Sequence, residues 1–206
     1  MIRTSFSKNR YAVGDEDLIV GTMKSDLGGQ ARGIIFCHGS GQSAQPLALE
    51  MHYLWDMLGR RAVVHVGDLG GQTWGSDTAV ARIKLARAEL RRRGVDGPIA
   101  LVGLSMGSCN ALNYAIRYPD EIACLALTIP VTDLVATRAD PTFTSVWPEI
   151  DAIYGAPPSA NYTGHNPIDF VDDLPADMPV KVWYAPNDPI VKVATVNAFL
   201  AARPQT

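Results

Sequence analysis

The sequence predicts an α/β fold with a central, mostly parallel sheet flanked by helices on both faces. Short apolar runs alternate with amphipathic helical patterns along most of the 206 residues, and the first buried run ends in a glycine-rich loop. This length suits one domain with a sizeable core. We therefore expect a single domain over residues 1–206, with its core in residues 1–130 and 176–206.

The expected elements follow this alternation. In residues 46–61, five apolar side chains recur on one helical stripe. Asp77 and Gly94 mark the beginning and the end of the next helix. The expected strands are 33–39, 62–68, 98–103 and 122–130, with a strand and loop over 178–189, and the expected helices are 46–61, 77–94, 106–118 and 190–203.

Regular alternation stops from Val131 to about Pro175. This stretch is rich in proline, threonine, aspartate and aromatic residues, among them Phe143, Trp147 and Tyr154. A long irregular insertion in an α/β chain is usually functional. We predict a cap or lid insertion over about 131–175.

Composition excludes several classes of function. The formal net charge of -3 gives no basic footprint for nucleic acid, and the arginines at 91–93 favour a helix C-terminus. The N-terminus lacks the apolar core of a signal peptide, and no apolar run is long enough for a membrane span, so cytoplasm is the default location. Four histidines and three cysteines lack ligand spacing, so we expect no metal.

The sequence GLSMG, residues 103–107, places Ser105 between an apolar strand and a helix. Small residues at Gly103 and Gly107 let strand and helix pack closely, which exposes the hydroxyl at the carboxyl end of the sheet. The Met106 amide then points from a helix N-terminus and can stabilise an oxyanion. The alternative is a serine that only caps the helix.

This pattern resembles the α/β-hydrolase superfamily over nearly the whole chain, through HGSG after an early strand, GLSMG, and NDPIV at 187–191. The resemblance implies that Asp188 is the acid of a catalytic triad and that 131–175 is the cap. It also implies a second oxyanion amide in the loop CHGSGQS, for which Ser40 is the first candidate and Gly41 the next. His38 either orients that loop or is satisfied by its carbonyls.

The stretch DLGGQTWGSDTAVAR, residues 68–82, resembles esterase-like members from actinobacteria and their phages. If the chain is phage-encoded, we expect it to be associated with the phage particle.

The order of the triad in this superfamily is serine, acid, histidine, yet no histidine follows Asp188. A serine without a base is a poor nucleophile at neutral pH. Three explanations remain open. A C-terminal part carrying the histidine is missing, or another histidine serves, or the fold is kept without catalysis.

His165 lies in the predicted cap and is the candidate for a replacement base, whereas His65 and His52 are more simply structural or surface residues. Asp133 is a rival to Asp188 as the acid, although it could instead cap the segment that follows it.

The function predicted from these residues is hydrolysis of a carboxylic ester by Ser105, with the Met106 and Ser40 amides holding the oxyanion and Asp188 orienting a histidine. This hydrolysis implies no cofactor. The prolines and aromatics of the cap predict a small-molecule substrate with an apolar portion. An amidase or peptidase of the same fold is an alternative. A second alternative is a catalytically silent subunit that docks a protein partner at its open sheet edge, for example in a phage particle.

Overall fold

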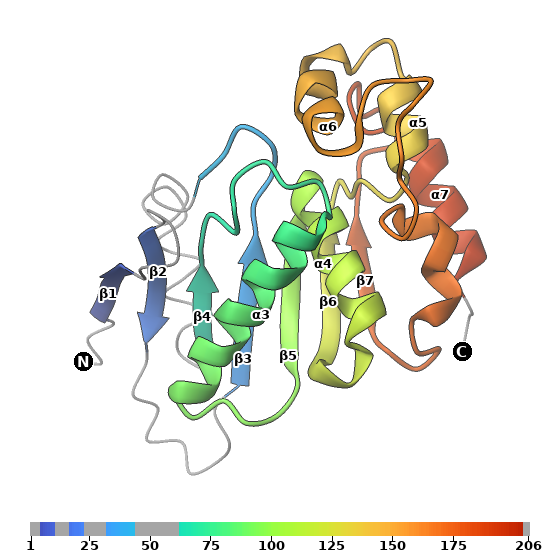
Figure 1. Cartoon of the computed structure of the whole chain (residues 1–206). Coiled ribbons are helices and arrows are strands. Elements are labelled where there is room, and N and C mark those ends of the chain that lie inside the picture. The colour runs from blue at the N-terminus through green and yellow to red at the C-terminus, as the bar shows by residue number, and fades with distance from the viewer. Residues whose placement is uncertain (1–4, 11–16, 23–31, 44–61, 204–206) are drawn as a thin grey trace.

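The structure, a computed structural model, describes residues 5–10, 17–22, 32–43 and 62–203 (Figure 1). Its sheet has the strand order β1-β2-β4-β3-β5-β6-β7. From β4 to β7 all neighbours are parallel, whereas β1 and β2 are antiparallel additions at one edge. The strands are β1 (Ser5–Arg10), β2 (Asp17–Thr22), β3 (Arg32–Cys37), β4 (Ala62–Val66), β5 (Ile99–Leu104), β6 (Ile122–Thr128) and β7 (Val180–Trp183).

The five parallel strands confirm the predicted fold class. Strands β3 and β5 pair at the centre, with Ile35 opposite Leu101 in the register, and both of these side chains are fully buried. Because layers of side chains cover both faces of a parallel sheet, its strands are apolar throughout rather than alternating. This explains the continuous apolar runs in the sequence.

Helices α3 (Asp77–Arg92) and α4 (Met106–Arg117) pack across one face of the sheet (Figure 1). Helix α3 ends as predicted, with Gly94 in the left-handed region at φ 86°. The expected helix 46–61 lies outside the described residues. No helix in the described ranges has the length and apolar character needed to cross a bilayer.

Helix α7 (Val193–Ala202) begins three residues later than the sequence predicted. The reason lies in the loop before it, where one oxygen of Asp188 accepts hydrogen bonds from the amides of Ile190 and Val191. These amides are held in a turn around the carboxylate and are not part of the helix.

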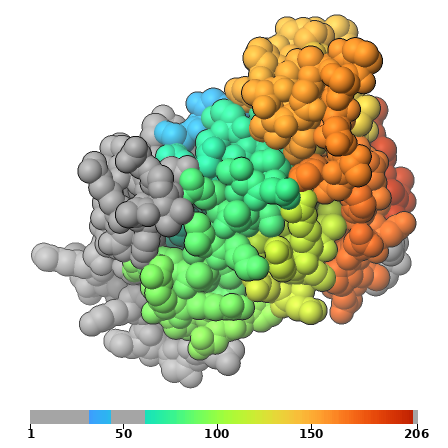
Figure 2. All heavy atoms as spheres, viewed as in Figure 1, coloured from blue at the N-terminus to red at the C-terminus, as the bar shows by residue number. Residues whose placement is uncertain are grey.

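The 131–175 segment is less irregular than its composition suggested. It contains α5 (Leu134–Ala139), α6 (Trp147–Tyr154) and 3-10 turns at Thr144–Val146 and Pro167–Asp173. Figure 1 shows α5 and α6 beyond the carboxyl ends of the central strands, and Figure 2 shows the segment as a lobe that projects from the body.

An apolar cluster attaches this segment to the sheet. Trp74 and Met106 from the body pack there with residues of the segment, and both side chains are fully buried. The members contributed by the segment are Val131, Leu134, Phe143, Val146, Ile150 and Tyr154. The segment is therefore held against the edge of the sheet where β5 ends and α4 begins.

Candidate functional site

Ser105 alone forms the turn between β5 and α4, with φ 51° and ψ -117°. Its amide donates to the carbonyl of Thr128 at 2.9 Å, and its carbonyl accepts from the Ser108 amide at 2.9 Å. A positive φ in a residue other than glycine costs about 1–2 kcal/mol, so it persists only where the surroundings impose it. The hydroxyl makes no capping hydrogen bond in the described part of the chain, so helix capping does not account for this serine.

Close approach of three segments explains the two glycines beside Ser105. A Cβ atom on Gly103 would lie 2.5 Å from the Cα of Ser108. A Cβ atom on Gly107 would overlap the carbonyl group of Cys37, at the end of β3. The packing role predicted for these glycines is therefore confirmed.

Backbone strain gathers at the same edge of the sheet. The residues other than glycine with positive φ, within the described ranges, are Leu69, Trp74, Ser105 and Ile129. Leu69, Ser105 and Ile129 lie within three residues of the ends of β4, β5 and β6, and Trp74 lies farther along the loop after β4. Ile129 is β-branched, which makes its conformation especially rare. Because such strain tends to cluster at functional sites, this edge is the candidate active site.

The loop after β3 lies directly beside Ser105. A Cβ atom on Gly39 would be 3.5 Å from the Cβ of Ser105. The ring of His38 is buried, with Nδ1 2.8 Å from the Gly39 carbonyl oxygen and Nε2 2.7 Å from the Asp68 carbonyl oxygen. His38 therefore fits both alternatives. Loop carbonyls are hydrogen-bond partners of its ring, and the ring links this loop to the loop after β4.

The amides of this loop are not equivalent. The Gly41 amide donates to Oε1 of Gln72 at 2.9 Å, so it is already occupied. Neither the Ser40 amide nor the Met106 amide meets an acceptor among the described residues. Of the two candidates in the loop, Ser40 is thus the one whose amide has no acceptor within the described ranges.

Asp188 lies at the same edge, two strands away from Ser105. The Ser105 amide bonds to Thr128 at the end of β6. The next residue, Ile129, donates its amide to the carbonyl of Trp183 at the end of β7, at 2.7 Å. Two strand spacings separate β5 from β7 by about 10 Å, so a third group is needed to connect the two side chains. One oxygen of Asp188 accepts two amides, and the other has no hydrogen-bond partner in the described ranges.

Asp133, the alternative candidate for the acid, caps a helix. It is the N-cap of α5, and its carboxylate accepts from the Ala136 amide at 3.0 Å. The alternative interpretation of Asp133 as a helix cap is confirmed.

His165 lies beside the middle of α4 and not over Ser105. Its carbonyl accepts from Asn113 at 2.7 Å. Asn113 is eight residues beyond Ser105, which corresponds to about 12 Å along the helix. The Nε2 atom of His165 is 3.1 Å from a carboxylate oxygen of Asp77, and Nδ1 is 2.9 Å from the Thr163 carbonyl oxygen. Both ring nitrogens thus face acceptors.

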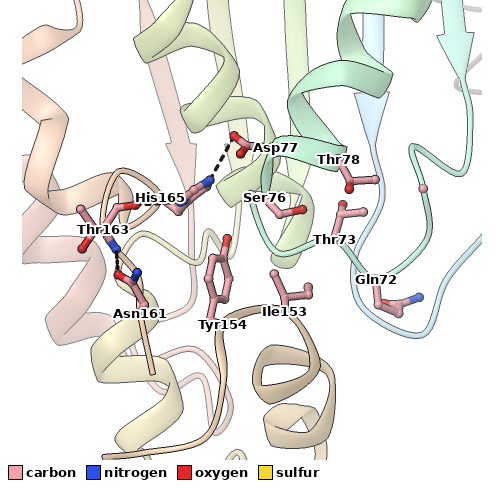
Figure 3. Close-up of a pocket in the computed structure, with 11 residues that line it drawn as sticks. Gln72, Thr73, Ser76, Asp77, Thr78, Ile153, Tyr154, Asn161, Thr163 and His165 are labelled. Carbon is pink, nitrogen blue, oxygen red and sulfur yellow. Dashed lines mark hydrogen bonds and ion pairs between the residues drawn. The ribbon is translucent and has the colours of Figure 1, made fainter. Parts of the chain in front are cut away.

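A pocket of about 490 Å³ surrounds His165, between the loop before α3 and the 131–175 segment (Figure 3). Asp77, Tyr154 and Asn161 line it with His165, whereas Ser105 does not. The hydroxyl of Tyr154 donates to the Trp74 carbonyl at 2.8 Å, and the Trp74 side chain packs in the cluster that contains Met106. The pocket and the Ser105 turn are therefore separate sites.

His65 belongs to the core of the sheet and is not a base at the Ser105 turn. His65 is fully buried in β4, and burial lowers the pKa of its imidazole to about 4, so the structural interpretation of this residue is confirmed. His52 lies outside the described residues. Within the described ranges, no group of three or more potential ligands is arranged to hold a metal ion.

Glu149 is a residue of this edge that the sequence did not reveal. Its Oε2 accepts from the Ser40 hydroxyl and from the Trp74 indole nitrogen, each at 2.8 Å. Glu149 is 109 positions from Ser40 and carries no motif, so no spacing in the sequence points to it.

Residues 34–152 match the family described as alpha/beta hydrolase fold. This match covers more than half of the chain, and the protein belongs to that family. The resemblance inferred from the sequence motifs is therefore confirmed.

Solved structures of the same fold include a puromycin-hydrolyzing peptidase from Mycobacterium tuberculosis, with a TM-score of 0.76, 21% identity, and coverage of 98% of this chain and 33% of that one. Oligopeptidase B from Leishmania major has a TM-score of 0.70 and 17% identity, with coverage of 100% and 31%. A lipase/esterase from Lactobacillus plantarum has a TM-score of 0.67 and 16% identity, with coverage of 98% and 86%.

The chain spans about a third of the length of the two peptidases. No curated protein matches it. Its fold is thus a hydrolase fold that is shared with both esterases and peptidases.

Proposed function

We propose that the protein is a serine hydrolase that cleaves a carboxylic ester through Ser105. The observation that carries this proposal is the Ser105 turn, where a strained backbone presents a hydroxyl that makes no capping hydrogen bond among the described residues. The Met106 amide follows this serine directly, and the loop that carries the Ser40 amide packs beside it. Fixed donors at the point where negative charge develops are usually the largest single contribution to such catalysis.

In the proposed reaction, the Ser105 oxygen attacks the ester carbonyl carbon and its proton passes to a histidine. The Met106 and Ser40 amides bind the resulting oxyanion. Collapse of the intermediate expels the alcohol, which takes the proton, and leaves an acyl group on Ser105. Water then attacks the acyl carbonyl, releases the acid and restores the serine.

Asp188 has the role of orienting that histidine and stabilising its protonated ring. This role is supported by the second carboxylate oxygen of Asp188, which has no partner in the part of the chain that the structure describes, while the first is fixed by two amides. Among the described residues we assign this role to none of the three histidines, since His38 and His165 contact carbonyl or carboxylate oxygens and His65 is buried in the sheet.

The proposed substrate keeps an apolar portion, as the composition of the 131–175 segment suggested. Two of its aromatic residues, Phe143 and Tyr154, are buried in the cluster that attaches the segment to the sheet. Because these two rings are already buried, we assign binding of the apolar portion of the substrate to other residues of the segment, on its face toward Ser105.

The direct test compares the 206-residue chain with its Ser105→Ala variant on p-nitrophenyl acetate, together with labelling by a fluorophosphonate. We expect a label on Ser105 of the parent protein, located by peptide mass spectrometry, and none on the variant. Ester turnover that depends on Ser105 would place the base within the 206 residues. Turnover retained by Ser105→Ala, or a label on another serine, would overturn the assignment.

An amidase or peptidase activity is supported by the two peptidases of similar fold, and the same groups at Ser105 serve both reactions. The rate on a p-nitroanilide, compared with the p-nitrophenyl ester of the same acyl group, distinguishes the two. A higher kcat/KM for the anilide would favour the amidase.

A second candidate function is a catalytically silent subunit that binds a protein at the outer edge of β7. Three large side chains near that edge are unusually exposed: Trp183 at 50%, Ile190 at 48% and Tyr184 at 38%. An unpaired strand edge is a template for another strand. This candidate predicts no fluorophosphonate label on Ser105, together with a stable complex that Trp183→Lys disrupts.

A further inference from the structure

The carboxylate of Glu149 joins three segments beside the proposed catalytic serine. Glu149 lies in the first turn of α6, whereas its two partners, Ser40 and Trp74, belong to the loops after β3 and β4. Ser40 directly follows Gly39, whose backbone packs against Ser105. The carboxylate is therefore placed next to the loop that supplies a proposed oxyanion amide.

No cationic side chain in the described ranges neutralises this carboxylate. The other two acidic groups of α6 and the stretch before it are paired, Asp151 with Arg138 at 2.6 Å and Asp140 with Lys192 at 3.5 Å. Both bonds to Glu149 use Oε2, so Oε1 has no partner among the described residues, and the residue is only partly buried. Glu149 thus places a carboxylate, one oxygen of which has no partner among the described residues, beside the loop after β3 that packs against Ser105.

This charge has a consequence for the proposed reaction. Two like charges a few ångströms apart in a partly desolvated site repel each other far more than in water. The negative charge on Glu149 therefore opposes the oxyanion that would form at the Ser40 amide. A cation bound to Glu149 would remove the repulsion and add an attraction.

We propose that Glu149 binds a protonated amine of the substrate, which makes esters or amides that carry such an amine the substrate class. This inference rests on the proposed function at Ser105. The free Oε1 accepts a hydrogen bond from the ammonium group, while Oε2 keeps its bonds to Ser40 and Trp74.

Glu149→Gln is a sharp test, because the amide oxygen of glutamine can still accept from Ser40 and Trp74 while the charge is lost. A merely structural role for Glu149 would survive this change. Asp172→Asn is the matched control, since Asp172 is an exposed acid of the same 131–175 segment.

The first readout is equilibrium binding, which does not require turnover. By NMR titration at pH 7.5, we expect the parent protein and Asp172→Asn to bind 2-phenylethylamine at least tenfold more tightly than 2-phenylethanol. We expect Glu149→Gln to bind the two equally. An equal affinity in the parent protein, or an unchanged preference in Glu149→Gln, would overturn the inference.

The second readout is turnover of leucine p-nitrophenyl ester against its N-acetyl derivative, which has no charge. Glu149→Gln should lower kcat/KM at least tenfold for the free amine and leave that of the acetylated substrate unchanged or higher. A failure of the proposed function appears differently, as no labelling of Ser105 and no turnover of either substrate. In that case the binding experiment still decides whether Glu149 is a cation site.

Discussion

Gly107 and Cys37 are in direct contact, because the first turn of α4 presses on the carbonyl at the end of β3 with no room for a Cβ atom. This contact brings the loop after β3 alongside the turn that carries Ser105. Both proposed oxyanion amides, those of Ser40 and Met106, are therefore placed by a single close approach between a helix and a strand. The geometry of the candidate site depends on a residue that itself has no functional group.

Replacing Gly107 by alanine should destabilise the protein and disturb the site together. The added methyl group overlaps backbone atoms of β3, which cannot move aside as a side chain would, so we expect a cost of about 3 kcal/mol. Gly94→Ala is the matched control. There the left-handed backbone is strained by about 1 kcal/mol, but nothing lies within 4 Å of the new methyl group.

Urea denaturation measures both Gly variants on the same scale through the midpoint concentration. Equal midpoints for Gly107→Ala and Gly94→Ala would show that the contact between α4 and β3 is looser than described.

Asp188→Asn should reduce Ser105-dependent ester hydrolysis on the order of 10⁴-fold, because the neutral amide cannot stabilise a protonated histidine. The asparagine oxygen still accepts from Ile190 and Val191, so the loop is expected to keep its shape. Asp133→Asn is the control, since Asp133 caps α5 in a similar way. The kcat values of the two variants are compared with that of the parent protein. A larger loss of kcat in Asp133→Asn would make Asp133 the acid instead of Asp188.

His165→Gln should change the rate of Ser105-dependent hydrolysis by less than about threefold. Its ring is bound to Asp77 and Thr163 and lies along α4 from Ser105, so it has no path to the serine proton. Loss of the contact with the exposed Asp77 should cost no more than about 1 kcal/mol of stability. A hundredfold fall in kcat with the fold intact would instead make His165 the base.

Stability should fall as the pH drops below neutrality because of His65. Burial lowers the pKa of its imidazole from 6.5 to about 4, so the unfolded chain binds this proton more readily than the folded one. The contribution of His65 is complete above pH 6.5 and is lost as the pH falls toward 4. Between pH 7.5 and 5 the free energy of unfolding should decrease by about 2 kcal/mol from this group.

His65→Leu removes this titration while filling similar space. Denaturant unfolding at pH 7.5 and 5 should therefore show a smaller decrease in the variant than in the parent protein, with the difference near the same 2 kcal/mol. If the two proteins lose equal stability, the ring is not buried in its neutral form.

The sequence by itself determined the parallel sheet, the helices α3 and α4, and the serine turn between β5 and α4. These features depend on short-range patterns. Continuous apolar runs specify buried parallel strands, and two glycines around one serine permit a sharp turn wherever a strand runs directly into a helix.

Only the tertiary structure decided which side chains meet at the candidate site. It excluded the Gly41 amide, assigned Asp133 to a helix cap and moved His165 to a separate pocket. It also brought Glu149 to Ser40 across 109 positions. Such pairings leave no periodic trace in the chain, because they arise where loops from different strands converge, and the packing of the whole fold sets that convergence.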